Sequence, residues 1–201
     1  GPATEVVQQT LQRAGLNDYR LHLYPWARAY DLALREPQVL IFLIARTPAR
    51  EALFQWAGEI MKIEYHLYRL RSRTLEVPHL DAARAYTIGV MRDDVRQQYL
   101  QSRGFTKLVV SAQPLDNFRK LVSGQVDMVP LTAGETLPLC KEAAIDCAQL
   151  ERVLTLHEAS TGLYMAYSRQ TPPEVVERTH KAFEQLKADG TVKRLLAKVS
   201  P

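Results

Sequence analysis

Residues 39–60 of the chain are VLIFLIARTPAREALFQWAGEI. The first six of these residues form a continuous apolar run, which is typical of a strand covered on both faces in a parallel sheet. A helical pattern follows in TPAREALF, residues 47–54, and EIMKIEYHLYRLR, residues 59–71, then has the pattern of one long extended segment. Strand, helix and strand in this order predict an α/β sheet.

The same alternation continues on both sides of this stretch. Helical spacing at residues 4–15 and 26–36 flanks the strand-like YRLHLY, residues 19–24. A polar break at residues 72–83 is followed by a second series of strands and helices. Its strand-like runs lie at residues 86–91, 107–111 and 126–131, and its helical runs lie at residues 93–104 and 114–124. We therefore expect two α/β units of comparable size, with two helical runs at the end of the chain.

Composition excludes several classes of protein. The net charge of the 201 residues is only +4, and the basic residues are scattered, so nucleic acid is not an expected partner. No apolar run reaches the roughly 18 residues of a membrane span, and no signal peptide opens the sequence. The five histidines lack ligand spacing, and no nucleophile or phosphate-loop motif is present. We expect no metal, no cofactor and no enzymatic activity.

Two permanent cations, Arg46 and Arg50, follow the apolar run 39–44 directly. Two positions on the surface of an ordinary helix would explain the pair, and so would a site that binds a polar or anionic ligand. Aromatic residues near arginine, such as Trp26 in YPWARAY, are typical of the walls of a small-molecule site.

Asp93 and Asp94 follow the predicted strand 86–91. Asp93 is a natural N-cap for the next helix, and Asp94 suits the positive end of that helix. This turn also follows the carboxyl end of a strand, where open α/β sheets bind ligands.

Cys140 and Cys147 are close enough in sequence to close a small loop. In an oxidising compartment a bridge would add about 2–3 kcal/mol to the stability. In a reducing compartment both residues would be free thiols.

Three motifs resemble those of one family. They are Thr47-x-x-Arg50 with Phe54 downstream, FRKLVSGQVDMV at residues 118–129, and AFEQLKADGTVKRLLAK at residues 182–198. In this order they resemble bacterial extracellular solute-binding proteins of the amino-acid type, and the resemblance covers essentially the whole chain. It implies the two-lobed type II periplasmic-binding-protein fold. Lobe one would be residues 1–84 plus 166–201, lobe two residues 85–165, with a hinge at the crossings.

The resemblance also implies a ligand site. Arg50 matches the family's arginine that binds the ligand's carboxylate, a contact that suits a planar guanidinium. Arg46 would be a second donor or a salt-bridge partner. The other expected contributors are Trp26 and Thr47 from lobe one, and Arg92, Asp93 and Thr132 from lobe two.

Departures from the family pattern restrict the ligand. Leu43 and Ala45 replace small Ser or Gly residues, and Asp93-Asp94 replaces Gly-Thr. Thr132 replaces the acid that holds the ligand's ammonium group, so we do not expect a standard α-amino acid. The chain also apparently lacks the family's first N-terminal strand, which would leave a neighbouring strand edge able to pair with another chain.

By resemblance the protein is a periplasmic substrate-binding component of an ABC importer. It would bind a small polar or anionic solute and interact with the transporter's membrane subunits, and this compartment would favour a disulfide between Cys140 and Cys147. The alternatives are the sensing domain of a membrane receptor of the histidine kinase type and, third, an enzyme similar to periplasmic dehydratases and lyases, in which Asp93 would be the cleft acid.

Overall fold

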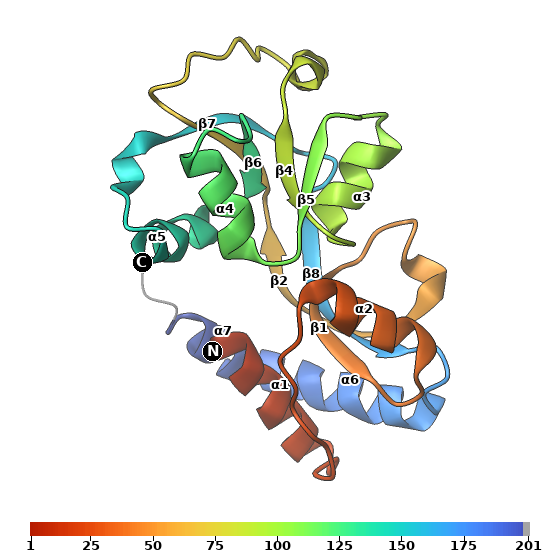
Figure 1. Cartoon of the computed structure of the whole chain (residues 1–201). Helices are drawn as coiled ribbons and strands as arrows, with labels where there is room; N and C mark the ends of the chain where they lie inside the picture. Colours follow the sequence, from red (N-terminus) through yellow and green to blue (C-terminus); the bar gives the residue numbers. More distant parts are fainter. Residues whose placement is uncertain (199–201) are drawn as a thin grey trace. The chain divides into compact units, whose positions relative to one another are not determined.

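The computed structural model describes residues 1–198, and their contacts divide the chain into two compact units. Within the described residues, unit 1 consists of Gly1–Tyr24, Arg28–Lys62 and residues 161–198, and unit 2 consists of Pro25–Ala27 and Ile63–Ser160. Both units contain strands and helices, as the predicted two-lobed α/β fold requires (Figure 1).

The chain changes units earlier than the sequence suggested. We expected the crossings near residues 84 and 166, whereas the contacts place them after Lys62 and after Ser160. The reason is β3 (His66–Leu70), which pairs on one side with β6 (Val129–Leu131) and on the other with β7 (Leu150–Thr155). Both partners belong to unit 2. Residues 199–201 of the expected first lobe lie outside the described chain.

Unit 1 contains a three-stranded sheet in the order β1-β8-β2. Its strands are β1 (Leu40–Ala45), β8 (Thr161–Ser168) and β2 (Phe54–Ile63, whose last residue already belongs to unit 2). Its helices are α1 (Pro2–Arg13), α2 (Trp26–Arg35, whose first two residues belong to unit 2), the 3-10 helix η1 (Glu51–Leu53), α6 (Pro173–Ala188) and α7 (Thr191–Leu196). The prediction of a parallel sheet around residues 39–44 is wrong for this pairing, because β8 runs antiparallel to β1.

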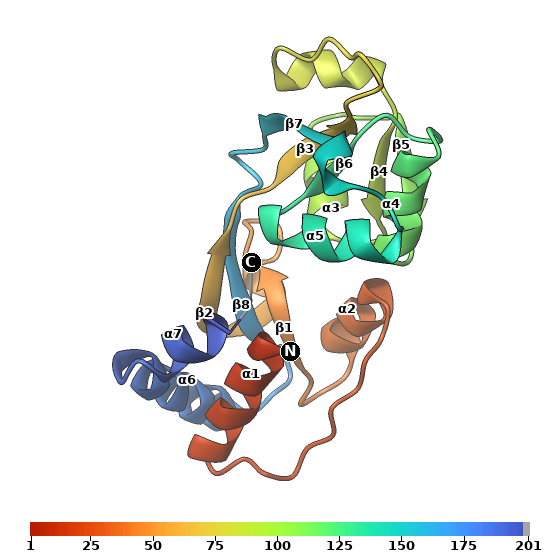
Figure 2. The same cartoon turned by 90° about the vertical axis from the view of Figure 1, so that its left-hand side faces the viewer.

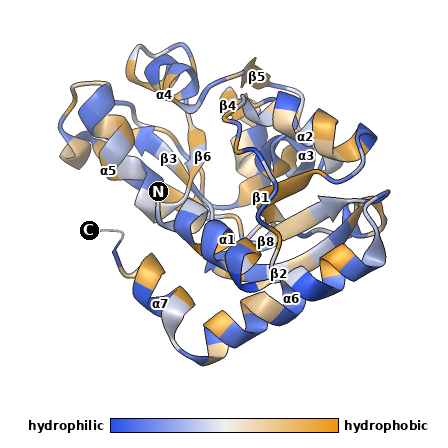
Figure 3. Cartoon of the chain, turned by 90° about the horizontal axis from the view of Figure 1, so that it is seen from below, coloured by the Kyte–Doolittle hydropathy of each residue, from blue (hydrophilic) through white to orange (hydrophobic). Residues whose placement is uncertain are grey.

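The core of unit 1 lies between this sheet and the helices α1, α6 and α7 (Figure 2). Val6 of α1, Met165 of β8 and Phe183 of α6 are each fully buried there. Figure 3 shows hydrophobic and hydrophilic residues recurring along α1 and α6, which is the pattern of helices with one buried face. Helical spacing of apolar residues thus fixes which face of each helix packs on the sheet.

The predicted strand at residues 19–24 is not formed. Residues 16–25 have no regular secondary structure, and no described strand pairs with them. The side chains of Tyr19, Leu21 and Leu23 are 43%, 52% and 99% exposed. The alternation in YRLHLY is real, but a strand also requires a neighbour for its backbone groups.

Two further predictions need correction. The helical pattern of residues 47–54 becomes a turn and the short η1, after which Phe54 already begins β2. The single extended segment of residues 59–71 is divided between β2 and β3, because Glu64 and Tyr65 belong to neither strand.

Unit 2 contains two small sheets. One is the antiparallel sheet β6-β3-β7, and the other is the parallel pair β4 (Ile88–Met91) and β5 (Leu108–Ser111). Its helices are η2 (Leu80–Ala85), α3 (Val95–Ser102), α4 (Pro114–Val122), α5 (Ala133–Glu142) and η3 (Cys147–Gln149). Phe118 and Leu121 of α4 are fully buried against Val129 of β6. The predicted strand–helix order over residues 86–131 is therefore confirmed, whereas α5 was not predicted.

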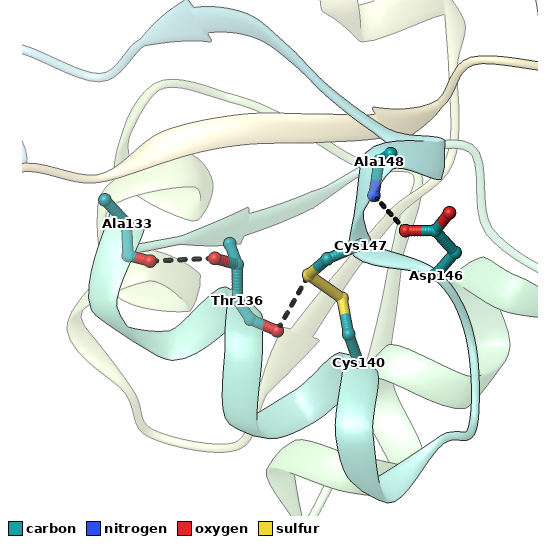
Figure 4. Close-up of a disulfide and its surroundings, with 6 residues drawn as sticks. All are labelled: Ala133, Thr136, Cys140, Asp146, Cys147 and Ala148. Carbon is teal, nitrogen blue, oxygen red and sulfur yellow. Dashed lines mark hydrogen bonds between the residues drawn. A yellow bond between two sulfur atoms is a disulfide. The ribbon is translucent and has the colours of Figure 1, made fainter. Parts of the chain in front are cut away.

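Cys140 of α5 and Cys147 of η3 form a disulfide, with their Cα atoms 5.5 Å apart (Figure 4). Of the two states that the sequence left open, the bridge is the one observed. It ties the last turn of α5 to the loop that leads into β7. Thr136 is nearby, with its carbonyl oxygen 3.3 Å from Cys147 Sγ.

Within residues 1–198, no helix combines the length and the apolar character that a membrane span requires. The same residues contain no group of three or more His, Cys, Asp and Glu side chains arranged to hold a metal ion.

Candidate functional site

Arg50 lies at the end of the turn that follows β1. Its side chain is 1% exposed, and its Nη1 donates a hydrogen bond to the carbonyl oxygen of Ala45 at 3.2 Å. The guanidinium carbon is 4.9 Å from the centroid of the Tyr30 ring, which belongs to α2. A guanidinium stacked on an aromatic ring and held by backbone oxygen has its orientation restricted.

Thr47 begins the same turn. Its carbonyl oxygen accepts the backbone N–H of Arg50 at 3.0 Å, which closes the turn, and the residue itself is half-buried. The predicted Thr-x-x-Arg element is therefore one compact piece of structure.

Arg46 is the last residue before this turn. Its Nε and Nη2 donate to the two carboxylate oxygens of Glu51 at 2.7 and 2.6 Å, and these hydrogen bonds raise the pKa of Arg46. The guanidinium carbon also lies 5.2 Å from the ring centroids of both Trp56 and Tyr164. Of the two roles that the sequence suggested for Arg46, the salt bridge is the one formed.

Trp26, Arg92 and Asp93 belong to unit 2. The indole Nε1 of Trp26 donates to the carbonyl oxygen of Asp93 at 3.1 Å, which brings two predicted site residues together. Arg92 is exposed, and its backbone N–H donates to Ser111.

The prediction that Asp93 caps α3 is wrong. The N-cap is Asp94, whose side chain accepts the backbone N–H of Arg96 at 2.8 Å. Asp93 instead has a φ of 60°, and its backbone N–H donates to the Gln97 side chain at 2.6 Å. A positive φ is more accessible to Asp than to most residues, so the sharp turn before the helix falls on Asp93.

Thr132 is the N-cap of α5. Its hydroxyl accepts the backbone N–H of Glu135 at 3.3 Å, and the Glu135 carboxylate accepts the backbone N–H of Thr132 at 2.9 Å. This reciprocal pair is a capping box, and T-x-x-E at residues 132–135 is its sequence signature. The sequence therefore contains the signal for this capping role of Thr132, in addition to the predicted role in ligand binding.

Sequence reasoning missed Arg96, which lies between the two helix ends. Its side chain bonds to Asp94 at 2.7 Å and to Glu135 at 3.0 Å, and its guanidinium carbon is 4.7 Å from the Tyr65 ring centroid. Burial opposes the charged form of Arg96, but the two carboxylates outweigh it and keep its pKa well above the ordinary value. The spacing of these residues in sequence gives no signal for the cluster.

The two groups of residues differ in chemistry. In unit 1 the turn after β1 holds a buried guanidinium. In unit 2 the N-terminal ends of α3 and α5, which attract anions, are already bound by the chain's own Asp94 and Glu135. A cation held in a fixed orientation is suited to binding an anionic group of a small molecule.

The chain has the fold of two-lobed binding proteins, as solved structures show. A histidine kinase sensor domain with similarity to periplasmic binding proteins matches it with a TM-score of 0.86 and 18% identity, covering 98% of this chain and 85% of that one. An ancestral arginine-binding protein bound to arginine matches with a TM-score of 0.82 and 16% identity over 100% and 88% of the two chains. The amino acid ABC transporter substrate-binding protein AbpA from Streptococcus pneumoniae, bound to L-arginine, matches with a TM-score of 0.80 and 16% identity over 99% and 83%.

No model of a known protein family matches the sequence, and no curated protein matches it either. At the identities of the structural matches, the likeness shows the fold alone.

Proposed function

We propose that this protein binds a small polar solute that carries a carboxylate, and that Arg50 binds the carboxylate. The observation that carries the proposal is the burial of Arg50, which is 1% exposed and stacked on Tyr30 in the turn that resembles the family's Thr-x-x-Arg element. Keeping a charged side chain in a buried position is costly, so such residues are often functional.

In this proposal the protein is a substrate-binding component of an ABC importer outside the cytoplasm. Structural neighbours described as ABC transporter substrate-binding proteins support this role, and the disulfide suits an oxidising compartment. The partners would be the transporter's membrane subunits. Binding without turnover is favoured because the neighbours named above are binding and sensing proteins rather than enzymes.

In unit 1 we propose Thr47 as a solute contact in addition to Arg50, and in unit 2 we propose Trp26, Arg92 and Asp93. In the structure Thr132 forms the capping box of α5, and Arg46 bonds to Glu51. We therefore propose that these two residues stabilise the local structure and do not contact the solute.

The test is a thermal-shift screen over amino acids, opines, small carboxylates and polyamines. A true ligand at 100 times its dissociation constant stabilises a protein by about 2.7 kcal/mol. We expect a hit among the carboxylates and loss of that shift in Arg50→Lys, which keeps the charge but not the planar fork. Arg35→Lys is the matched control, because Arg35 makes an exposed bidentate pair with Asp31 elsewhere in unit 1. Equal binding by wild type and Arg50→Lys, or no carboxylate hit, would overturn the proposal.

One observation favours a second candidate, the sensing domain of a membrane receptor. The histidine kinase sensor domain matches with a TM-score of 0.86. The full gene decides between the two: an encoded transmembrane segment followed by a kinase domain supports sensing, and a gene without them supports transport.

A further inference from the structure

The turn that carries Arg50 is closed by a pair of side chains at its two ends. Arg46 precedes the turn and Glu51 follows it, and their guanidinium and carboxylate are joined by hydrogen bonds of 2.7 and 2.6 Å. Because both oxygens of one carboxylate are used, the contact fixes relative orientation as well as distance. The two ends of residues 47–50 are therefore held at a set separation.

Two aromatic rings fix this pair to the sheet. Trp56 of β2 and Tyr164 of β8 lie edge to face, with ring centroids 5.5 Å apart, and the Arg46 guanidinium carbon is 5.2 Å from each centroid. An exposed ion pair alone contributes little to stability, but a bidentate pair that also stacks on two rings belongs to a network. We call Arg46, Glu51, Trp56 and Tyr164 the clasp.

The backbone at both ends of the turn is tied to the same strands. Trp56 Nε1 donates to the carbonyl oxygen of Glu51 at 3.1 Å, and the Thr161 hydroxyl donates to the carbonyl oxygen of Arg46 at 3.3 Å. Tyr164 is itself oriented, because its hydroxyl donates to Glu59 at 3.0 Å. The turn is thus attached to β2 at one end and to β8 at the other.

This turn contributes to the placement of Arg50. Its backbone N–H donates to the carbonyl oxygen of Thr47 inside the turn, and its side chain donates to the carbonyl oxygen of Ala45, the residue directly before Arg46, and stacks on Tyr30 of α2. A guanidinium that is already oriented loses less conformational freedom on binding than a mobile one.

We propose that Arg46 is a positioning residue: the clasp holds the turn of residues 47–50 so that Arg50 is oriented before the solute arrives, and Arg46 does not itself touch the solute. The role of Arg50 in this statement rests on the proposed function, whereas the effect of the clasp on the turn does not.

The first experiment needs no ligand. Amide hydrogen exchange is measured for the peptide covering residues 45–54 in wild type, Arg46→Ala and the control Arg35→Ala, which removes an equally bidentate pair from α2. We expect exchange about tenfold faster in Arg46→Ala alone, which corresponds to about 1.4 kcal/mol of lost protection. Arg46→Lys should give an intermediate rate. Unchanged exchange in Arg46→Ala, or an equal change in Arg35→Ala, overturns the clasp.

The second experiment measures binding of the opine octopine and of the small carboxylate succinate by calorimetry. We expect Arg46→Ala to weaken binding about tenfold, with Arg46→Lys recovering part of the loss, and Arg50→Ala to abolish binding. If Arg50→Ala abolishes binding while Arg46→Ala changes nothing, the positioning role is wrong and the proposed function stands. If wild type binds none of the probes, or if Arg50→Ala binds as wild type does, the proposed function loses its support, and the exchange experiment still decides the clasp.

Discussion

The guanidinium of Arg96 and the carboxylate of Asp94 form a buried ion pair, with Nε 2.7 Å from Oδ1 and Nη2 2.8 Å from Oδ2. Asp94 caps α3, and the third nitrogen of Arg96 bonds to Glu135, which completes the capping box of α5. One cation therefore joins the N-termini of two helices. Since these helix ends are already bound by carboxylates, we do not expect them to bind the solute's negative charge.

Replacing Arg96 with Met should destabilise unit 2 strongly. The substitution removes the guanidinium that bonds to both carboxylate oxygens of Asp94, which is 7% exposed, and breaking a buried pair in this way costs about 3–5 kcal/mol. The free energy of unfolding from urea denaturation measures the effect. Arg103→Met is the control, because its pair with Glu158 is about half exposed and should contribute less than about 1 kcal/mol. Similar losses in both variants would contradict the role assigned to Arg96.

The clasp in unit 1 should open in acid. Hydrogen bonds from Arg46 lower the pKa of the Glu51 carboxyl below its ordinary value of 4.5. A group whose pKa is lower in the folded state contributes stability above its unfolded value, and the contribution is lost as pH falls through the folded value. We therefore expect a change in Trp56 fluorescence below pH 4.5 in a Trp26→Phe background.

Glu51→Gln in the same background is the control for that titration. The amide does not titrate, so its fluorescence should be nearly constant over the same range of pH. An identical acid transition in both proteins would assign the change to another group.

The disulfide should contribute about 2–3 kcal/mol, since the bridge spans a sequence separation of only 7 residues and closes a short loop. Cys140→Ala, Cys147→Ala and the double variant should lose the same stability, because each removes the whole bridge. Urea denaturation of wild type with and without a reductant gives an independent measure. A single variant as stable as wild type would show that the bridge contributes nothing.

The sequence predicted the fold well where a local residue pattern determines the structure by itself, without a partner far away in the chain. The motifs at residues 118–129 and 182–198 identified the two-lobed architecture, and the alternating strands and helices of residues 86–131 followed from periodicity, whereas α5 was not predicted. The pattern of residues 19–24 failed because strand formation depends on a partner that the sequence pattern does not specify. The antiparallel pairing of β1 likewise depends on β8, more than 100 residues away.

The candidate site was less accessible to sequence reasoning. Thr47 and Arg50 lie in one turn, as expected of residues that are close in sequence, and the capping box at Thr132 had a recognisable spacing. Arg96 and Glu135 meet only because α3 and α5 begin at neighbouring positions in the fold. Tyr164 reaches Arg46 only through the pairing of β8 with β1. Contacts of this kind become visible only when the strands are in place.

Gly58 in β2 is required by the packing of Phe183. A Cβ at Gly58 would meet the Phe183 ring at Cδ2, with Cε2 2.8 Å and Cγ 3.1 Å away, and the ring is fully buried in the core of unit 1. Gly58→Ala should therefore lower the free energy of unfolding by about 1–3 kcal/mol through overpacking. Gly134→Ala is the matched control, because a Cβ there meets nothing within 4 Å and the residue lies inside α5, where Ala is favoured by up to about 1 kcal/mol. Urea denaturation should show opposite signs for the two variants. The double variant Gly58→Ala/Phe183→Leu tests the cause, because the smaller side chain makes room for the added methyl group and should cost less than the two single losses combined.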